Sequence, residues 1–442
     1  MHTLDSRGFR LGFATFVLFT GLAGDFWRNL LTWYGYGALV AIIVAISIVL
    51  LVRNRSKARL SELPYPLLAF LLLATVSIAW SYYPLSTALG TTVQWITTAA
   101  AVSVAVTLSW VELLTVLGRV FRLILGLSFL FEFVVSVFIR HPIYPVWLVP
   151  DDPKHPSQLL YWSRGLLFHG GKIQGIVGNS SLLAMIALLA IIVFVIQLRT
   201  KSVSPVWGAF WAIVAAVTIV ITRSATINVA VAVVVVVLAA VLLVRRARTP
   251  RGRAYTYGGI GIVVVTIAVI GTVVRGPLLG LLGKSADFTG RIGIWQAVIH
   301  LSQERPAFGW GWVSYWTPWV APFKNLIKRG GVQVMHAHDA WLDIWLQLGI
   351  VGLVVFGTLV LATLIRAWLM AVDRIITRTG AVGRYSSIAL LPILMLSAQL
   401  IQSIAESRIL VEGGWMLLVI WAVKTKLDPL RDEPADRLKG AA

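Results

Sequence analysis

Repeated long apolar runs constrain the fold of this chain more than any other feature of its sequence. About 20 apolar residues in a helix are needed to cross the roughly 30 Å hydrocarbon core of a bilayer. The runs are continuously apolar, which favours spanning helices over the alternating strands of a membrane barrel. We therefore expect an all-α polytopic integral membrane protein with about twelve transmembrane helices. They cover residues 9–27, 30–52, 63–80, 88–109, 113–139, 174–198, 205–222, 226–244, 255–274, 341–369, 385–405 and 409–424.

The formal net charge of +20 is concentrated in short loops between these runs, so it argues for membrane topology and against a nucleic-acid partner. With twelve spans, the basic loops and both termini fall on one side, which the positive-inside rule assigns to the cytoplasm. The connections 81–87, 222–226 and 405–409 then face outward, and Arg223 and Arg408 are their only basic residues. The basic loops hold Arg53, Arg55, Lys57, Arg59, Arg199, Lys201, Arg245, Arg246, Arg248, Arg251, Arg253, Arg366, Arg374, Arg378 and Arg384, and the tail holds Lys424, Lys426, Arg431, Arg437 and Lys439.

Two long segments, 140–173 and 275–340, interrupt the apolar pattern and also fall on the outer side. Loops of this length are uncommon in a compact protein and usually functional. No internal repeat or separate soluble domain is evident, so residues 1–442 should form a single domain. The chain has no cysteine, which excludes a disulfide framework, a thiolate metal site and a cysteine nucleophile. We expect no cleavable signal peptide, because the first run lacks a small-residue cleavage site.

A histidine-containing segment, His336-Ala337-His338-Asp339, lies where the larger loop enters the tenth span. A histidine at a helix N-terminus feels the positive end of the helix dipole, which favours a neutral ring that can accept a proton. His338 is therefore a candidate general base. The pattern is also compatible with metal ligands, although its spacing matches no specific zinc site, or with a histidine pair that makes ordinary hydrogen bonds.

Several basic residues near the outer face could bind phosphate. Arg291 stands between Gly290 and Ile292-Gly293, and arginine presents a planar fork that suits phosphate oxygens. Arg223 lies at an outer span junction, and Arg164 and Lys172 lie in the first long loop. Arg291 and Arg223 could instead contact lipid headgroups. Their shared side suits a reaction at a lipid-linked phosphate, and the chain has no glycine-rich nucleotide loop.

The larger loop also contains Gly309-Trp310-Gly311-Trp312. Tryptophan rings on a bendable backbone can stack on sugars, so Trp310 is a candidate sugar contact. Tryptophan is equally the standard anchor at a membrane interface, and that alternative stays open.

The motifs resemble those of the O-antigen ligase and O-antigen polymerase superfamily of bacterial membrane glycosyltransferases. Gly290-Arg291 followed by Trp295 resembles the family's Gly-Arg-x-x-x-Trp, and Gly309-Trp310-Gly311 resembles its Gly-x-Gly. The segment from His338-Asp339-Ala340-Trp341-Leu342 to Gly349-Ile350-Val351-Gly352 resembles the family's His-Asn-x-aromatic-Leu helix that closes on Gly-x-x-Gly. Gly175-Ile176-Val177-Gly178-Asn179 resembles a further family stretch. Asp339 replaces the usual Asn, and Ala225 stands where the family places Arg or Lys, with Arg223 two residues earlier.

The resemblance implies a GT-C-like enzyme in the bacterial cytoplasmic membrane, with an extracytoplasmic active site. Its donor would be an undecaprenyl-diphosphate-linked glycan, and a hydroxyl on a glycan or lipid acceptor would attack with inversion. His338 would be the base and Arg291 would act with it in catalysis. The diphosphate would be bound by Arg223, Arg164, Lys172 and His336, and the sugar or acceptor would contact Trp310 and Asp339. No cofactor or metal is expected. Ligase and polymerase share these motifs, with a slight preference for polymerase.

Two other functions stay open. An anion or lipid-linked-glycan transporter is disfavoured by the lack of an internal repeat. A metal-dependent glycosyltransferase that uses a lipid-phosphate sugar would place acidic residues in its outer loops, where Asp25 and Asp151-Asp152 are the candidates.

Overall fold

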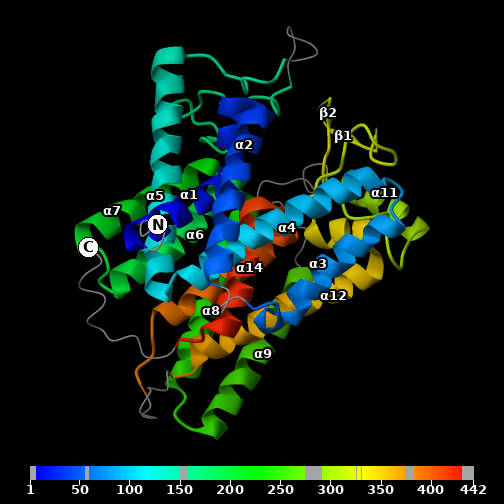
Figure 1. The fold of residues 1–442 in the computed structure, drawn as a ribbon. Helices are drawn as coiled ribbons and strands as arrows, with labels where there is room; N and C mark the ends of the chain where they lie inside the picture. Colours follow the sequence, from blue (N-terminus) through cyan, green and yellow to red (C-terminus); the bar gives the residue numbers. More distant parts are fainter. Residues whose placement is uncertain are drawn as a thin grey trace.

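The computed structural model describes residues 6–54, 59–149, 157–273, 291–324, 326–329, 331–374 and 383–430. Within these ranges an α-helix occupies each of the twelve predicted runs (Figure 1). The helices are α1 Arg7–Leu22, α2 Gly24–Arg53, α3 Tyr65–Val76, α4 Pro84–Thr107, α5 Trp110–Val134, α6 Ser180–Arg199, α7 Pro205–Thr222, α8 Ala225–Arg246, α9 Pro250–Val273, α12 Ala340–Val372, α13 Leu391–Ser403 and α14 Glu412–Leu427.

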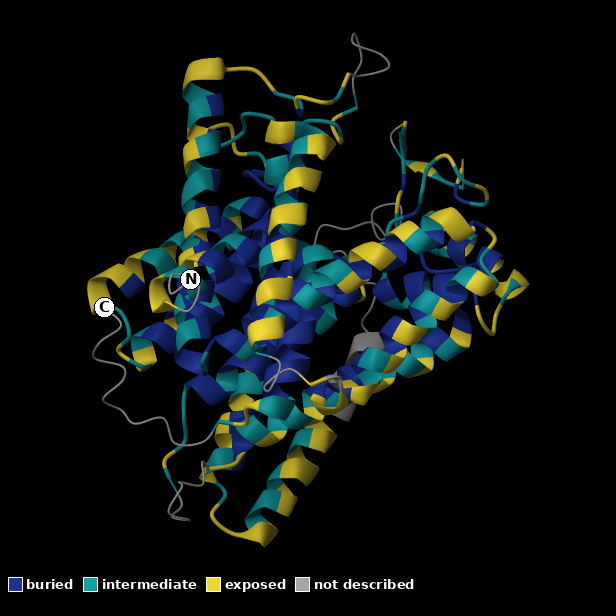
Figure 2. Cartoon of the chain, in the orientation of Figure 1, coloured by how far each residue is buried: buried dark blue, intermediate teal, exposed yellow. Residues whose placement is uncertain are grey.

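Seven of the described helices are long and apolar enough to cross a membrane, namely α2, α4, α5 with its π-helical extension to Ile139, α6, α7, α8 and α12. The prediction of an all-α polytopic membrane protein is therefore confirmed. Two shorter apolar helices, α3 and α13, are lengthened by 3₁₀ turns at Ser77–Ala79 and Ile388–Leu390. The most deeply buried helices, α6 and α14, lie in the middle of the bundle, whereas α9 lies at its edge (Figure 2).

The larger outer loop is partly structured, which the sequence analysis did not predict. It contains helix α11 (Arg291–Glu304) and a hairpin of β1 (Lys328–Arg329) and β2 (Val332–Gln333), paired antiparallel with Lys328 opposite Gln333. Several predicted features lie outside the described residues. They are Gly290 and the rest of 275–290, Asp151-Asp152, and the basic residues Arg55, Lys57, Arg378, Arg431, Arg437 and Lys439.

The predicted cytoplasmic loops meet at one end of the bundle. Arg245 at the end of α8 donates hydrogen bonds to the carbonyls of Ala371 (2.6 Å) and Ser386 (3.1 Å). Arg253 near the start of α9 forms an ion pair with Asp373 after α12 (2.8 Å). These contacts join the basic loop 245–253 to 371–386, which agrees with the even number of spans predicted between them.

A break in α12 docks the larger outer loop onto the helix bundle. Gly349 has φ 67° and ψ −166°, a conformation that essentially only glycine adopts, and it interrupts the helical hydrogen bonds. Segment 306–311 fills the gap, because backbone polar groups in a membrane protein must be satisfied internally. Four backbone bonds close the break: Trp310 N to Leu346 O (3.0 Å), Gly311 N to Gln347 O (2.9 Å), Ile350 N to Pro306 O (2.9 Å) and Val351 N to Ala307 O (3.2 Å).

Replacing Gly349 with alanine should undo this docking. A Cβ there would lie 2.1 Å from the Ala307 carbonyl oxygen, and the backbone conformation would be strained whatever the space. We expect a loss of about 3 kcal/mol in the free energy of unfolding, measured by thermal unfolding in detergent. Gly357→Ala in the same helix is the matched control, because its Cβ would meet only Trp341 at 4.0 Å. Equal stability of the two variants would contradict the docking role.

Candidate active site

The described residues form a large cavity of about 1110 Å³ at the end of the bundle opposite the basic loops. Its walls come from α2 and α4, the loop before α6, the α7–α8 turn, α11, segment 313–338 and segment 406–416. Five predicted site residues line it: Lys172, Arg223, Arg291, His336 and His338. These residues lie up to 166 positions apart in sequence, from 172 to 338. The fold therefore brings together basic and histidine residues that were predicted to lie on the same side of the membrane.

Glu406 joins the two predicted catalytic residues. Its Oε2 lies 3.0 Å from His338 Nδ1, and its Oε1 accepts a hydrogen bond from Arg291 Nη2 at 2.8 Å. All three side chains are largely buried. Burial alone would raise the pKa of Glu406, but the hydrogen bond from His338 and the charge of Arg291 hold it below its usual range. The carboxylate is therefore ionised at neutral pH and fixes His338 with its proton on Nδ1 and its lone pair on Nε2.

Asp343 fastens the two segments that carry His338 and Glu406. Its Oδ2 accepts hydrogen bonds from the Ala337 backbone N–H (3.0 Å) and from the Ser407 hydroxyl. His338 itself has a positive φ of 52°, a backbone conformation that is uncommon for residues other than glycine. The surrounding bonds therefore hold the histidine in a position that an isolated chain would avoid.

His336 lies directly beside His338, with their ring centroids 4.1 Å apart. The backbone N–H of His338 donates to His336 Nδ1 at 3.1 Å. Burial and then the proximity of His338 lower the pKa of His336 to about 3, and Glu406 opposes this only in part. His336 is therefore neutral at physiological pH.

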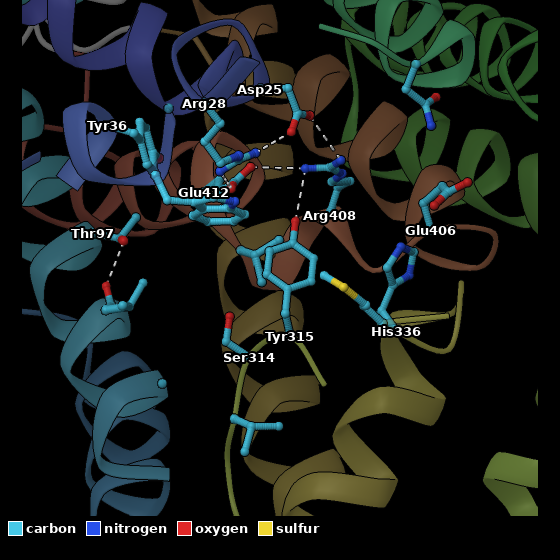
Figure 3. Close-up of a pocket in the computed structure, with 18 of the residues that line it drawn as sticks. Asp25, Arg28, Tyr36, Thr97, Ser314, Tyr315, His336, Glu406, Arg408 and Glu412 are labelled. Carbon is cyan, nitrogen blue, oxygen red and sulfur yellow. Dashed lines mark hydrogen bonds and ion pairs between the residues drawn. The ribbon is translucent and has the colours of Figure 1, made fainter. Parts of the chain in front are cut away.

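A closed ring of four charged side chains, Asp25, Arg28, Arg408 and Glu412, lines the same cavity (Figure 3). Arg28 bridges Asp25 and Glu412 at 2.5 Å each, and Arg408 bridges the same two carboxylates at 3.5 and 3.0 Å. Arg408 also donates to the Tyr315 hydroxyl (3.0 Å). Burial lowers the pKa of Arg408, but Tyr315 and the carboxylates of Asp25 and Glu412 outweigh this effect and raise it above its usual range. The ring is electrically neutral as a whole and ties α2 to α14.

Three further cations line the cavity without an ion pair in the described part of the chain: Lys172, Arg223 and Arg329. They come from the loop before α6, from the left-handed residue that ends α7 (φ 49°), and from β1. The lining thus holds six Arg or Lys and only three Asp or Glu residues. The resulting excess of positive charge suits an anionic ligand.

Three predicted site residues do not line the cavity. Arg164 donates to the Lys172 carbonyl (3.3 Å) and so braces the backbone of that cavity residue. Trp310 is buried, donates from its indole to the Leu301 carbonyl (2.9 Å) and stacks under Arg305. Asp339 caps α12 by accepting hydrogen bonds from two backbone N–H groups. Their predicted roles in contacting substrate stay predictions.

The group His336, His338 and Glu406 could be considered for a divalent cation, because one ligand atom of each lies within 4.8 Å of the others. Both Glu406 oxygens are already engaged, one of them by the positively charged Arg291. A bound cation would therefore share its carboxylate with an arginine. The donor set is a poor fit for a metal.

Glu406, Arg28, Glu412 and Tyr315 were not predicted as site residues from the sequence. Asp25 was a candidate only for another function, and Arg408 was identified only as a loop charge. One sequence feature could have indicated these site residues. Two acidic residues, Glu406 and Glu412, flank Arg408 in an otherwise apolar region at a short outward connection. No spacing rule connects Glu406 with His338, because they lie 68 positions apart.

The fold and the cavity define an enzyme-like site in a polytopic membrane bundle. The family model described as "O-Antigen ligase" matches residues 209–357, which include Arg223, α11 and the histidine segment. Exopolysaccharide production protein ExoQ of Rhizobium meliloti (strain 1021) is 29% identical over 89 residues. That match spans 20% of this chain and 20% of the relative. The matches support the O-antigen ligase and polymerase superfamily assignment that the motifs predicted.

Asp339 stands where the family motif has Asn, and its role as the cap of α12 predicts the effect of restoring Asn. Asn and Asp cap helices about equally well, so Asp339→Asn should keep the stability of the protein. Asp339→Ala should lose about 1 kcal/mol, because the Trp341 and Leu342 N–H groups lose their acceptor. Thermal unfolding measures both. A loss in Asp339→Asn as large as in Asp339→Ala would show that the carboxylate charge matters and the cap does not.

Proposed function

We propose that this protein is a membrane glycosyltransferase that transfers or polymerises a glycan from an undecaprenyl-diphosphate-linked donor onto a sugar hydroxyl. The observation that carries the proposal is the His338–Glu406–Arg291 group in a cavity with an excess of positive charge. The reaction takes place at the outer face of the cytoplasmic membrane and inverts the configuration at the anomeric carbon. The family match and the polysaccharide-production relative support this class of reaction.

His338 acts as the general base in this reaction. Its Nδ1 is held by Glu406, so Nε2 accepts the proton of the attacking hydroxyl. The hydroxyl oxygen then bonds to the anomeric carbon, and the bond from that carbon to the diphosphate oxygen breaks. Its electron pair leaves with the lipid diphosphate. Glu406 stabilises the imidazolium that forms, as the carboxylate does in other histidine–carboxylate pairs.

The unpaired cations Lys172, Arg223 and Arg329 bind the donor diphosphate, and Arg291 stabilises the charge that develops on the leaving group. Hydrogen-bond donors fixed in advance around a leaving oxyanion often contribute most of the rate enhancement, because they need no reorganisation during the reaction. Arg223 can serve here although it lies two places from the family position, since the α7–α8 turn brings it into the cavity lining.

An apolar wall of the same cavity accommodates the polyprenyl chain. α2 contributes Val40, Ile43 and Val44, and α4 contributes Leu89, Val93 and Ile96. The neutral four-charge ring forms another wall, where the adjacent Trp33 and Tyr36 offer aromatic surface. A neutral acceptor glycan is not drawn to free cations, so we place it at this wall. The relative is named for exopolysaccharide production, which supports a role in polysaccharide synthesis, and of the two we propose a polymerase.

Incubating the purified protein with an undecaprenyl-diphosphate-linked glycan should lengthen the glycan or move it to an acceptor, as seen by gel electrophoresis and mass spectrometry. His338→Ala should lower the rate by roughly 10²–10⁴, the usual contribution of a general base. Glu406→Gln should lower it too, because the amide cannot stabilise an imidazolium.

Exposed residues of α11 supply matched controls, namely His300→Ala and Glu304→Gln. Both should retain wild-type rates. Full transfer by His338→Ala would remove this residue as the base. Transfer that is abolished by EDTA and restored by Mg²⁺ or Mn²⁺ would instead favour a metal-dependent enzyme.

The sidedness of the site can be tested because the natural chain has no cysteine. Single cysteines at two exposed positions, His169→Cys in the first outer loop and Arg251→Cys in a basic loop, should differ in accessibility. In intact cells a membrane-impermeant maleimide should label His169→Cys but not Arg251→Cys, and lysis should expose both. The opposite pattern would place the active site at the cytoplasmic face.

A further inference from the structure

His336 and its neighbour His338 both line the cavity, but their ring nitrogens have different hydrogen-bond partners. The Nδ1 atom of His336 accepts the backbone N–H of His338, so Nδ1 cannot carry a proton. A neutral imidazole has a proton on one nitrogen only, and His336 must therefore carry it on Nε2. In the described part of the chain, no protein group bonds to that Nε2 atom. The two adjacent rings thus have opposite tautomers.

We propose that His336 is a neutral hydrogen-bond donor whose Nε2–H binds the diphosphate oxygen that leaves the anomeric carbon. This inference rests on the proposed function and assigns different tasks to the two histidines. His338 receives the proton of the attacking hydroxyl at Nε2. His336 donates a hydrogen bond to the leaving oxygen and keeps its proton throughout the reaction.

A hydrogen-bond donor helps the reaction at the leaving oxygen and hinders it at the attacking oxygen, which favours the leaving oxygen as the partner of His336. A donor aimed at the acceptor hydroxyl oxygen would withdraw electron density from the nucleophile, whereas a donor aimed at the leaving oxygen stabilises its growing charge. Neutral His336 is also compatible with a basic neighbour, because an imidazolium 4.1 Å away would oppose protonation of His338. A neutral histidine that polarises an oxygen is an established catalytic arrangement.

The spacing of the two rings also fits one inverting displacement. The attacking and leaving oxygens lie on opposite sides of one carbon, with the attacking atom roughly 3–3.5 Å from it before reaction. The two oxygens are therefore a few ångströms apart, comparable to the 4.1 Å between the ring centroids. The charged groups near His336 are Glu406, Arg291 and Arg408, and Tyr315 lies 6.1 Å away between centroids. Figure 3 places the His336 ring beside Glu406, Arg408 and Tyr315 at the cavity.

Two isosteric substitutions separate the donor role from a structural one. The side-chain amide of asparagine overlays Nδ1 of histidine, so His336→Asn keeps an acceptor for the His338 N–H but has no group at Nε2. The amide of glutamine overlays Nε2, so His336→Gln keeps the donor to the ligand but loses the internal acceptor. A purely structural His336 predicts that His336→Asn resembles wild type and His336→Gln does not.

The proposal predicts the reverse for binding of undecaprenyl diphosphate to the purified full-length protein, measured by isothermal titration calorimetry in detergent. His336→Asn should weaken binding roughly tenfold or more, because a hydrogen bond to a charged group is lost. His336→Gln should remain within about threefold of wild type. Thermal unfolding of both variants serves as the control, because it shows whether a variant that binds more weakly has also lost its fold.

Binding by His336→Asn at wild-type affinity would overturn the inference while the proposed function stands. Failure of the wild-type protein to bind undecaprenyl diphosphate would overturn both. A ¹⁵N spectrum of histidine-labelled protein at pH 6 gives an independent readout. It should contain a neutral Nε2–H histidine that disappears in His336→Asn. A charged or Nδ1–H state for His336 would contradict the proposal.

Discussion

The rest of the site depends on the two bonds that the Glu406 carboxylate makes, one to Arg291 and one to His338. Glu406 lies in the connection between α13 and α14, binds Arg291 at the start of α11 and binds His338 just before α12. A buried carboxylate is costly unless its oxygens are paired, and here each oxygen has one strong partner. Loss of either partner would leave a buried charge incompletely compensated. These two bonds of Glu406, together with those of Asp343, therefore fix the three elements relative to one another.

The bonds of Glu406 can form only because the larger loop is held in place elsewhere. Segment 306–311 enters the break at Gly349, and its backbone replaces the missing helical hydrogen bonds of α12. Gly309 permits this approach, since a Cβ there would lie 2.5 Å from the Gln347 carbonyl carbon of α12, and Gly311 permits close packing of the segment on Ser81, which its Cβ would meet at 2.4 Å. The glycines of this motif thus serve close packing, and Trp310 between them is buried against the loop. The motif positions the chemistry without lining the cavity.

These contacts explain which parts of the protein could be predicted from sequence. The helices follow from hydropathy, because a spanning segment must be apolar along its length. Arg291 and His338 were identifiable because each stands in a local motif. Glu406 was not, since a single acid in a short connection has no local pattern that relates it to a histidine 68 positions away. Helix α11 was also missed, because hydropathy finds spans and α11 is a short, only partly apolar helix in the loop.

On the proposed function, the balance of charge in the cavity affects how readily the product leaves after transfer. Arg28, Arg291 and Arg408 are each paired with a carboxylate, and three cations remain unpaired in the described part of the chain. On the proposed function, the ligand for those cations is a diphosphate that must bind before transfer and leave afterwards. Six unpaired cations would bind the product diphosphate more tightly and slow its release, and binding that is equal in the ground state and the transition state does not raise kcat. Pairing half of them with Asp25, Glu406 and Glu412 keeps an anionic donor attracted while the product can still dissociate.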